Sequence, residues 1–303
     1  MAIFDTGNFA IAGWATQPVA GTPVAAANYL AGQLGSISAD FDPDIQPVDI
    51  LSGSLNQTVA AVTRKGKGAW KAASDLFQVM NINFLAQCGV GATITAPTRT
   101  TLTLSGAMGA YQYPGAFADT IRIRGDAATG GMIEYSGIYT ERPVAVTALT
   151  APSLTGDDPY TWEDFIQMTL LTGAASVNDV ESIDMTISLM HALGYGNSGV
   201  ALPNIAVVNA VKITGTVVLF MNDTNIAQYN AGIAKDGTAG SMVFGWDKVI
   251  TGTTKTLITL PHIKYSKPRI SYPKDGIDLI TLGFESYSPT LVNQLTFVQT
   301  VNP

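Results

Sequence analysis

Hydrophobic and polar residues alternate along several short segments of this chain. Ile121 and Ile123 alternate with Arg122 and Arg124, and the sequence GDAATGG then leads into a second apolar segment, residues 132–140. Alternation with a period of two places the apolar residues on one face of a strand. Two such segments around a glycine-containing turn predict a β-hairpin. The arginines then lie on a solvated strand face, with an interaction surface as the alternative.

The same alternation predicts most of the other strands. Thr, Val and Ile are frequent and long helical periodicities are rare, which favours strands over helices. The first half contains two more predicted strands, at residues 34–41 and 59–72, before the hairpin. The second half contains predicted strands at residues 185–189, 211–220, 242–246, 256–260, 263–265 and 279–287, followed by a polar tail.

Two short helices interrupt the strands. The first is expected to begin at Ser74 as its N-cap, to carry apolar residues at helical spacing, and to end at Gly89 as its C-cap glycine. The second is expected to run from Asp223, its N-cap, to Ile233. The predicted fold is therefore mainly β, with one flanking helix in each half.

Three stretches rich in Ala, Gly, Pro or Thr are predicted to lie outside the strands. Residues 1–34 are predicted to be an extended N-terminal arm, residues 42–60 a long loop, and residues 143–176 a connector between domains. The expected organisation is an arm (1–34), a first β unit (35–150) and a second β unit with a C-terminal tail (151–303). Four carboxylates lie in or beside the long loop: Asp40, Asp42, Asp44 and Asp49.

The two halves resemble each other in sequence order. The segment VTRKGKGAWKAASDLFQVMNINF, from residue 62, aligns without a gap with VKITGTVVLFMNDTNIAQYNAGI, from residue 211. A repeat near 150 residues indicates two domains of one kind instead of a solenoid. In this alignment Gly66 pairs with Gly215 and Ser74 with Asp223, and further along residues 133–137 resemble residues 279–283.

Charge is scarce in this chain. Only 13% of the 303 residues are charged, whereas about a quarter is usual, and the net charge is −7. A chain with so few charges tends to bury surface against other chains, although a well-covered monomer is the alternative. An acidic chain repels phosphate backbones, so tight nucleic-acid binding is not expected.

The hydrophobic segments do not predict a membrane protein. The start, MAIFDTGNFAIAGWATQ, lacks the basic and apolar regions of a secretory signal. The most apolar run, residues 205–221, is interrupted by Asn209 and Lys212 and falls short of the roughly 20 apolar residues of a spanning helix. A soluble protein made in the cytoplasm, without membrane insertion, is expected.

The reactive residues do not form a known catalytic pattern. The serine-hydrolase, metalloprotease and P-loop motifs are absent from the sequence. Cys88 is the only cysteine, which excludes an intrachain disulfide, and its apolar surroundings indicate an inert thiol. A catalytic pair of Cys88 with His191 or His262 is therefore not favoured. We expect no catalytic, cofactor or metal site and no enzymatic activity.

Two other patterns are rejected on spacing. Glycines 194, 196 and 199 fit a dinucleotide-binding motif only at the wrong offset, and a strand follows them. The sequence DFDPD, residues 40–44, lacks the glycine and the distant Glu of a calcium loop, so a solvated acidic loop is the interpretation. The polar run Asn222, Asp223 and Asn225 is interpreted as helix capping.

The chain resembles the tail tube proteins of long-tailed bacteriophages. The resemblance covers most of the sequence beyond residue 30 and is carried by the segments TRKGKGAW, ASDLFQVMNINFLAQCG, TIRIRGDAATGGMIEYSG, LITLPHIKY and GFESYSP. It implies tandem β-sandwich or barrel units, each with one flanking helix, that self-assemble into rings around a lumen. Stacked rings form the tube through which the genome passes. A negatively charged lumen would keep the DNA from sticking.

The resemblance also implies partners. A chain with two units is expected to form a trimeric pseudo-hexamer, and otherwise a hexamer, in each ring. Residues 42–60, the arm and the tail are expected to contact the adjacent ring. The other expected partners are the tape measure protein and the tail terminator and baseplate proteins, while genomic DNA passes without specific binding. The expected location is the virion tail, assembled in the host cytoplasm.

Two alternatives remain at this point. One is another structural component of the tail or baseplate, which would not polymerise alone into long tubes. The other is a carbohydrate-binding β-sandwich, which would need exposed aromatic side chains in one groove. The candidates for such a groove are Tyr111, Tyr113, Trp162 and Trp246.

Overall fold

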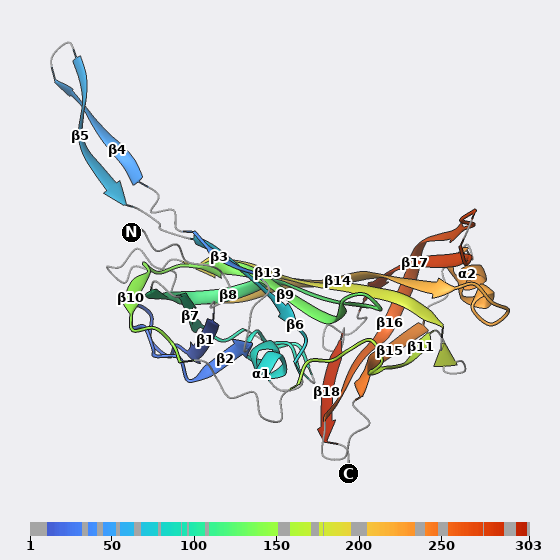
Figure 1. The fold of residues 1–303 in the computed structure, drawn as a ribbon. Coiled ribbons are helices and arrows are strands. Elements are labelled where there is room, and N and C mark those ends of the chain that lie inside the picture. Colours follow the sequence, from blue (N-terminus) through green and yellow to red (C-terminus); the bar gives the residue numbers. More distant parts are fainter. Residues whose placement is uncertain are drawn as a thin grey trace.

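The chain is mainly β, as the alternating pattern predicts (Figure 1). The structure is a computed structural model. It describes residues 11–31, 36–40, 45–52, 55–63, 68–77, 80–91, 93–95, 97–106, 109–150, 158–170, 176–177, 179–194, 205–233, 240–247, 254–274, 276–287 and 295–301.

Most strands belong to one antiparallel sheet, which runs the length of the molecule in Figure 1. The first half contributes β1 (Ile11–Thr16), β2 (Asn28–Ala31), β3 (Ser36–Ala39), β6 (Gly68–Asp75), α1 (Met80–Gln87), β7 (Thr100–Gly106), β8 (Gly109–Asp126), β9 (Gly130–Tyr139) and β10 (Val144–Val146). The second half contributes β11 (Phe165–Leu170), β12 (Ser176–Val177), β13 (Val180–Gly194), β14 (Ile205–Phe220), α2 (Ile226–Ile233), β15 (Gly240–Asp247), β16 (Thr254–Ser271), β17 (Leu279–Ser286) and β18 (Thr296–Val301).

The two halves have the same strand connections. In the first half the pairing runs β3–β6–β9–β8–β7–β1–β2, with β10 also on β8. In the second half it runs β13–β14–β17–β16–β15–β11–β12, with β18 also on β16. The helix follows the corresponding strand in each half, α1 after β6 and α2 after β14. The halves are joined by the pairing of β8 with β13.

The pairing gives a different register for the repeat than the gapless sequence alignment. Each residue of β6, from Gly68 to Asp75, pairs with one residue of β9, and β14 pairs with β17 in the same way from Ile213 to Phe220. Gly68 therefore corresponds to Ile213, and Trp70, not Gly66, corresponds to Gly215. The alignment failed because the large core side chain lies on the first strand of the pair in one half, Trp70 of β6, and on the second strand in the other half, Phe284 of β17.

The N-cap assigned to Ser74 is wrong. Ser74 lies in β6, where it is buried and pairs with Ile133 of β9, and α1 begins only at Met80. Buried and more exposed residues alternate along β6 through Ser74, so this segment is a strand although its sequence is also compatible with the start of a helix. Gly89 does have the expected positive φ, 83°, just after α1. Near α2, Asn222 Oδ1 accepts a hydrogen bond from the Asn225 amide at 2.7 Å.

Three stretches predicted to be irregular contain strands. The N-terminal arm contributes β1 and β2, with Ala12 and Leu30 fully buried, and the connector contributes β10, β11 and β12. The long loop of residues 42–60 instead contains β4 (Ile45–Ser52) and most of β5 (Leu55–Thr63), which among the described strands pair with each other and with no third strand (Figure 1). Neighbouring strands satisfy the backbone of these Pro- and Gly-containing segments, which local composition does not reveal.

The core lies on one face of the sheet. In the first half Phe84 of α1 packs against Trp14, Trp70 and Tyr135, with ring centroids 5.6, 6.1 and 5.0 Å apart. In the second half Trp246 packs against Phe244 and Phe165. The two clusters belong to a single core. Among the described residues, the opposite face of the central strands is lined by polar and charged side chains, and we call it the open face.

The predicted hairpin of residues 121–140 is confirmed as β8 and β9. Asp126 Oδ1 accepts hydrogen bonds from the amides of Ala128 and Thr129, each at 2.8 Å, and Gly130 has a φ of 66°. The side chain of Asp126 and the left-handed glycine together reverse the chain direction.

Candidate functional site

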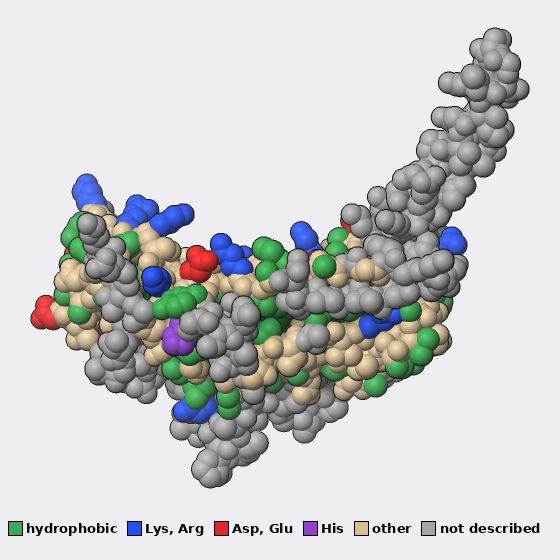
Figure 2. Space-filling view, turned by 180° about the vertical axis from the view of Figure 1, so that it is seen from behind, with side chains coloured by type: hydrophobic (Ala, Val, Ile, Leu, Met, Phe, Trp, Pro, Cys, Tyr) green, Lys and Arg blue, Asp and Glu red, His purple; other side chains and the backbone are tan. Residues whose placement is uncertain are grey.

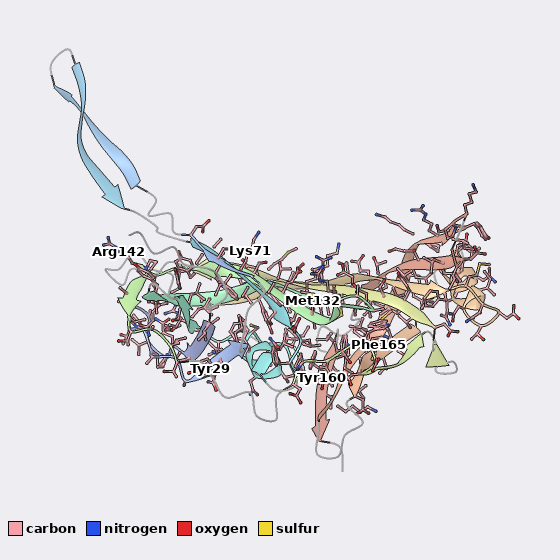
Figure 3. All side chains as sticks on the ribbon, viewed as in Figure 1. Tyr29, Lys71, Met132, Arg142, Tyr160 and Phe165 are labelled. Carbon is pink, nitrogen blue, oxygen red and sulfur yellow. The ribbon has the colours of Figure 1, made fainter. Side chains whose placement is uncertain are left out.

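The open face of the central sheet is polar and partly exposed. Consecutive paired strands place Arg122 of β8, Thr186 of β13, Thr214 of β14 and Glu285 of β17 side by side across it. Figure 3 shows Lys71 on this side of the sheet, whereas Tyr160 and Phe165 lie on the core side. A sheet with one face buried in the core and one face exposed to solvent requires apolar and polar residues to alternate along each strand, as they do in the sequence.

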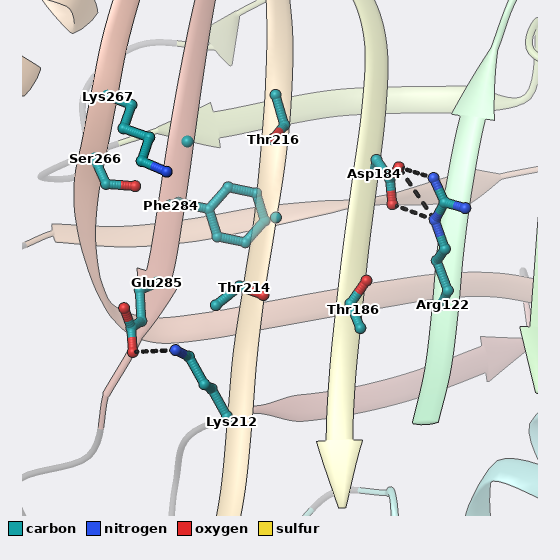
Figure 4. Close-up of a pocket in the computed structure, with 12 residues that line it drawn as sticks. Arg122, Asp184, Thr186, Lys212, Thr214, Thr216, Ser266, Lys267, Phe284 and Glu285 are labelled. Atoms are coloured by element: carbon teal, nitrogen blue, oxygen red, sulfur yellow. Dashed lines mark hydrogen bonds and ion pairs between the residues drawn. The ribbon is translucent and has the colours of Figure 1, made fainter. Parts of the chain in front are cut away.

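Arg122 connects the two halves on this face (Figure 4). Its Nε lies 2.9 Å from Asp184 Oδ1, its Nη2 also contacts Asp184, and its Nη1 lies 3.4 Å from Glu134 Oε2. The hydrogen bond to Asp184 raises the pKa of the Arg122 guanidinium above its usual value. Sequence reasoning assigned Arg122 to a solvated face and missed Asp184, which lies in the other half of the chain.

A shallow hollow of about 740 Å³ extends from this ion pair across β13, β14, β17 and β16. Lys212 and Glu285 form an ion pair at one side of it, with Nζ 3.7 Å from Oε1 (Figure 4). The residues that line the hollow include neither cysteine nor histidine. It offers paired charges and hydroxyl groups, a surface suited to contact with a polymer or with solvent.

This face is not acidic. Lys71, Arg122, Lys212 and Lys267 line two hollows on it together with Glu134, Asp184 and Glu285. The net charge of −7 therefore does not come from this part of the surface. A channel lined by this face would have mixed charge, in contrast to the negatively charged lumen expected from the resemblance.

Cys88 lies at the end of α1 and is 4% exposed. Burial raises the pKa of its thiol well above the usual range. We therefore expect the native protein to react with iodoacetamide at pH 8 at least about tenfold more slowly than the unfolded protein, because the thiolate is the reactive form. Mass spectrometry of timed samples measures this, and equal rates in the two states would contradict the buried position.

The histidines lie on separate strands of the second half. His191 of β13 has a buried side chain, and its Nδ1 lies 2.7 Å from Oδ1 of Asp119 on β8, just beyond the last β8–β13 pair. His262 of β16 is exposed and lies beside Tyr287, with ring centroids 5.7 Å apart. Each histidine has a structural neighbour, and neither is placed beside Cys88 by any contact among the described residues.

The acidic segment is only partly described. Asp40 is exposed, and its Oδ1 accepts a hydrogen bond from the Ala69 amide at 2.7 Å. Asp42 and Asp44 lie outside the described residues, as does the side chain of Asp49. Within the described part of the chain, no group of three or more His, Cys, Asp or Glu residues is placed to hold a metal ion.

The four aromatic candidates for a sugar-binding groove do not form one surface. Trp246 is fully buried, and Trp162 stacks on Phe165 at 4.5 Å beside it. Tyr113 packs on Tyr139 on another part of the sheet, and only Tyr111 is an exposed ring.

The sequence matches no protein-family model and no curated protein. In the described part of the chain, no helix has the length and hydrophobicity needed to cross a membrane. The geometry of the sheet is therefore the basis for assigning a function.

Proposed function

We propose that this chain is a structural subunit that self-assembles into rings, which stack to form a bacteriophage tail tube. The observation that carries the proposal is the β8–β13 junction. There, two units with the same strand connections join edge to edge into one continuous sheet with an open polar face. A unit that joins a like unit within the chain can join further units between chains by the same kind of contact.

The organisation of the units supports the rest of the proposal. The two tail-tube-like units of one chain occupy two positions in a ring, so three chains form a trimeric pseudo-hexamer. Rings then stack into a tube that serves as the conduit for DNA ejection. The remaining partners are the tape measure, terminator and baseplate proteins, and the location is the virion tail. The mixed charge of the open face is compatible with DNA passing without tight binding.

Negative-stain electron microscopy of the purified protein, combined with native mass spectrometry, tests this proposal. We expect rings or hollow tubes with a regular axial repeat, and ring masses corresponding to three chains. Six chains in each ring would contradict the pseudo-hexamer but keep the tube. A protein that stays monomeric at every protein and salt concentration would overturn the proposed function. Finite assemblies without tubes would instead indicate another tail or baseplate component.

A further inference from the structure

The pairing of β8 with β13 shows how the first unit binds the edge of the second. Residues Thr120–Asp126 of β8 pair on one side with β9 and on the other side with β13. Across the second interface Asp184 lies opposite Arg124, and Thr186 lies opposite Arg122. Basic residues on β8 therefore meet an acidic residue on β13, and the Arg122–Asp184 ion pair spans the junction.

At the two ends of the molecule, no second described strand pairs with the corresponding edges. Among the strands of the described chain, residues 264–271 of β16 pair with β17 alone, and β3 pairs with β6 alone. β16 is the counterpart of β8, and β3 is the counterpart of β13. The strand order β3–β6–β9–β8–β13–β14–β17–β16 thus has β3, the counterpart of β13, at one end and β16, the counterpart of β8, at the other end.

The strand pairs fix which residues correspond. Glu134, opposite Arg122, corresponds to Thr281, and Thr281 lies opposite Arg269, so Arg269 holds the position of Arg122. By the same steps Ser271 holds the position of Arg124. On the other edge, Ser38 lies opposite Lys71 as Asp184 lies opposite Thr216, so Ser38 holds the position of Asp184. Asp40 then holds the position of Thr186.

We propose that β16 of one copy pairs antiparallel with β3 of the next copy, with Ser271 opposite Ser38 and Arg269 opposite Asp40. This inference rests on the proposed function, because it names the joint that closes the ring. Main-chain hydrogen bonds between two free edges provide the attraction, as in other cases of strand addition. The opposite charges of Arg269 and Asp40 set the register.

Charge favours this head-to-tail joint over other edge contacts. Lys264, Lys267, Arg269 and Lys274 are all exposed. Figure 2 shows basic side chains gathered at the upper left, the end that carries α2 in Figure 1. Two β16 edges would bring like charges together, which is unfavourable. The opposite edge carries the exposed carboxylate of Asp40.

The β4–β5 hairpin has a counterpart in the same scheme. β3, β4, β5 and β6 lie along one long hairpin, as β13 and β14 do in the second half. β13 extends along the first half, whereas β4 and β5 stand away from the rest of the molecule (Figure 1). Within one chain, β13 and β14 extend over the first half. Once β3 pairs with β16 of the next copy, β4 and β5 extend in the same way over the second half of that copy.

Charge reversal tests the joint. Arg269→Glu and Asp40→Lys should each raise the protein concentration needed for ring formation by about tenfold or more, measured by analytical ultracentrifugation and electron microscopy. The double variant D40K/R269E should recover assembly, because the opposite charges face each other again. Both side chains are exposed, and Arg269→Glu should keep the circular dichroism spectrum and melting temperature of the wild type. Asp40→Lys also removes the acceptor of the Ala69 amide, so its melting temperature is measured beside that of D40K/R269E, which shares this loss but restores the opposite charges.

Cysteine pairs test the register independently. In a Cys88→Ala background, the pair Ser38→Cys and Ser271→Cys should give covalent oligomers on oxidation, seen in non-reducing gels. The matched pair Ser38→Cys and Ser266→Cys should give at least tenfold less. If the wild type forms rings but the charge variants assemble normally and S38C/S271C does not cross-link, this joint is wrong and the proposed function stands. A wild type that never assembles overturns both.

Discussion

Gly137→Val is expected to prevent stable folding of the first half of the chain. Gly137 of β9 lies opposite Trp70 of β6. A Cβ at Gly137 would collide with the carbonyl oxygen of Phe117 and lie 2.8 Å from Trp70 Nε1. Trp70 is 1% exposed, and Nε1 donates to the carbonyls of Phe117 and Ile138. Backbone and indole must both shift, so we expect a loss of about 3 kcal/mol or more in the free energy of unfolding.

Chemical denaturation followed by circular dichroism measures this effect. Gly91→Ala is the control, because a Cβ there meets no atom within 4 Å and should change the free energy of unfolding by less than about 0.5 kcal/mol. An unfolding free energy of Gly137→Val within about 1 kcal/mol of the wild type would show that the β6–β9 packing is wrong.

The second half contains the same close packing with the strands exchanged. There the glycine, Gly215, lies on β14 and the large side chain, Phe284, lies on β17. A Cβ at Gly215 would collide with the Phe284 ring and with the Asp184 carbonyl oxygen. Equivalent strand pairs thus each combine one glycine with one aromatic residue, but on opposite strands. This exchange explains why matching glycine with glycine in the sequence gave the wrong register.

Trp246→Ala is expected to reduce the free energy of unfolding by about 3–5 kcal/mol, as for other fully buried aromatic residues. Trp246 lies on β15 of the second half, is fully buried, and packs on Phe244, Phe165 and Tyr160. It also packs against the first half, since a Cβ at Gly125 of β8 would lie 3.2 Å from its ring. The truncation therefore leaves a cavity where the two halves meet.

Guanidinium unfolding monitored by fluorescence and circular dichroism tests this prediction. Trp246→Phe should lose clearly less free energy of unfolding, because a phenyl ring still fills most of the site. No hydrogen bond is lost, since the indole Nε1 has no hydrogen-bond partner among the described residues. Two separate unfolding transitions in Trp246→Ala, against one in the wild type, would show that this contact couples the halves. Equal stability of Trp246→Ala and the wild type would contradict the packing between β15 and β8.

The sequence predicted the β-rich class, because the alternation in β8, β9, β14 and β17 is strong and each strand buries one face. It also located both helices, although α1 begins six residues after the assigned cap at Ser74 and α2 begins three residues after the assigned cap at Asp223. Gly89 was identified correctly because a left-handed residue after a helix strongly favours glycine. The duplication was recognised in order but not in register.

Other features depended on partners far away in the chain. β1 and β2 are short segments of a Pro- and Gly-rich region, and they are strands because β7 pairs with β1. Arg122 alternates as a solvated residue should, yet its partner Asp184 is on β13. Cys88 was predicted to be buried and inert from its apolar neighbours, and its 4% exposure agrees.

By itself, the sequence determined the alternation, the helices and the scarcity of charge, because these follow from the side chains of neighbouring residues. Only the tertiary structure decided that the two halves share one sheet and that β8 pairs with β13. It also decided that, among the described strands, β3 and residues 264–271 of β16 each have one unpaired edge. The physical reason is that strand pairing satisfies backbone groups, which are the same in every residue. Side-chain patterns therefore show which segments are strands, and the folded chain shows which edges meet.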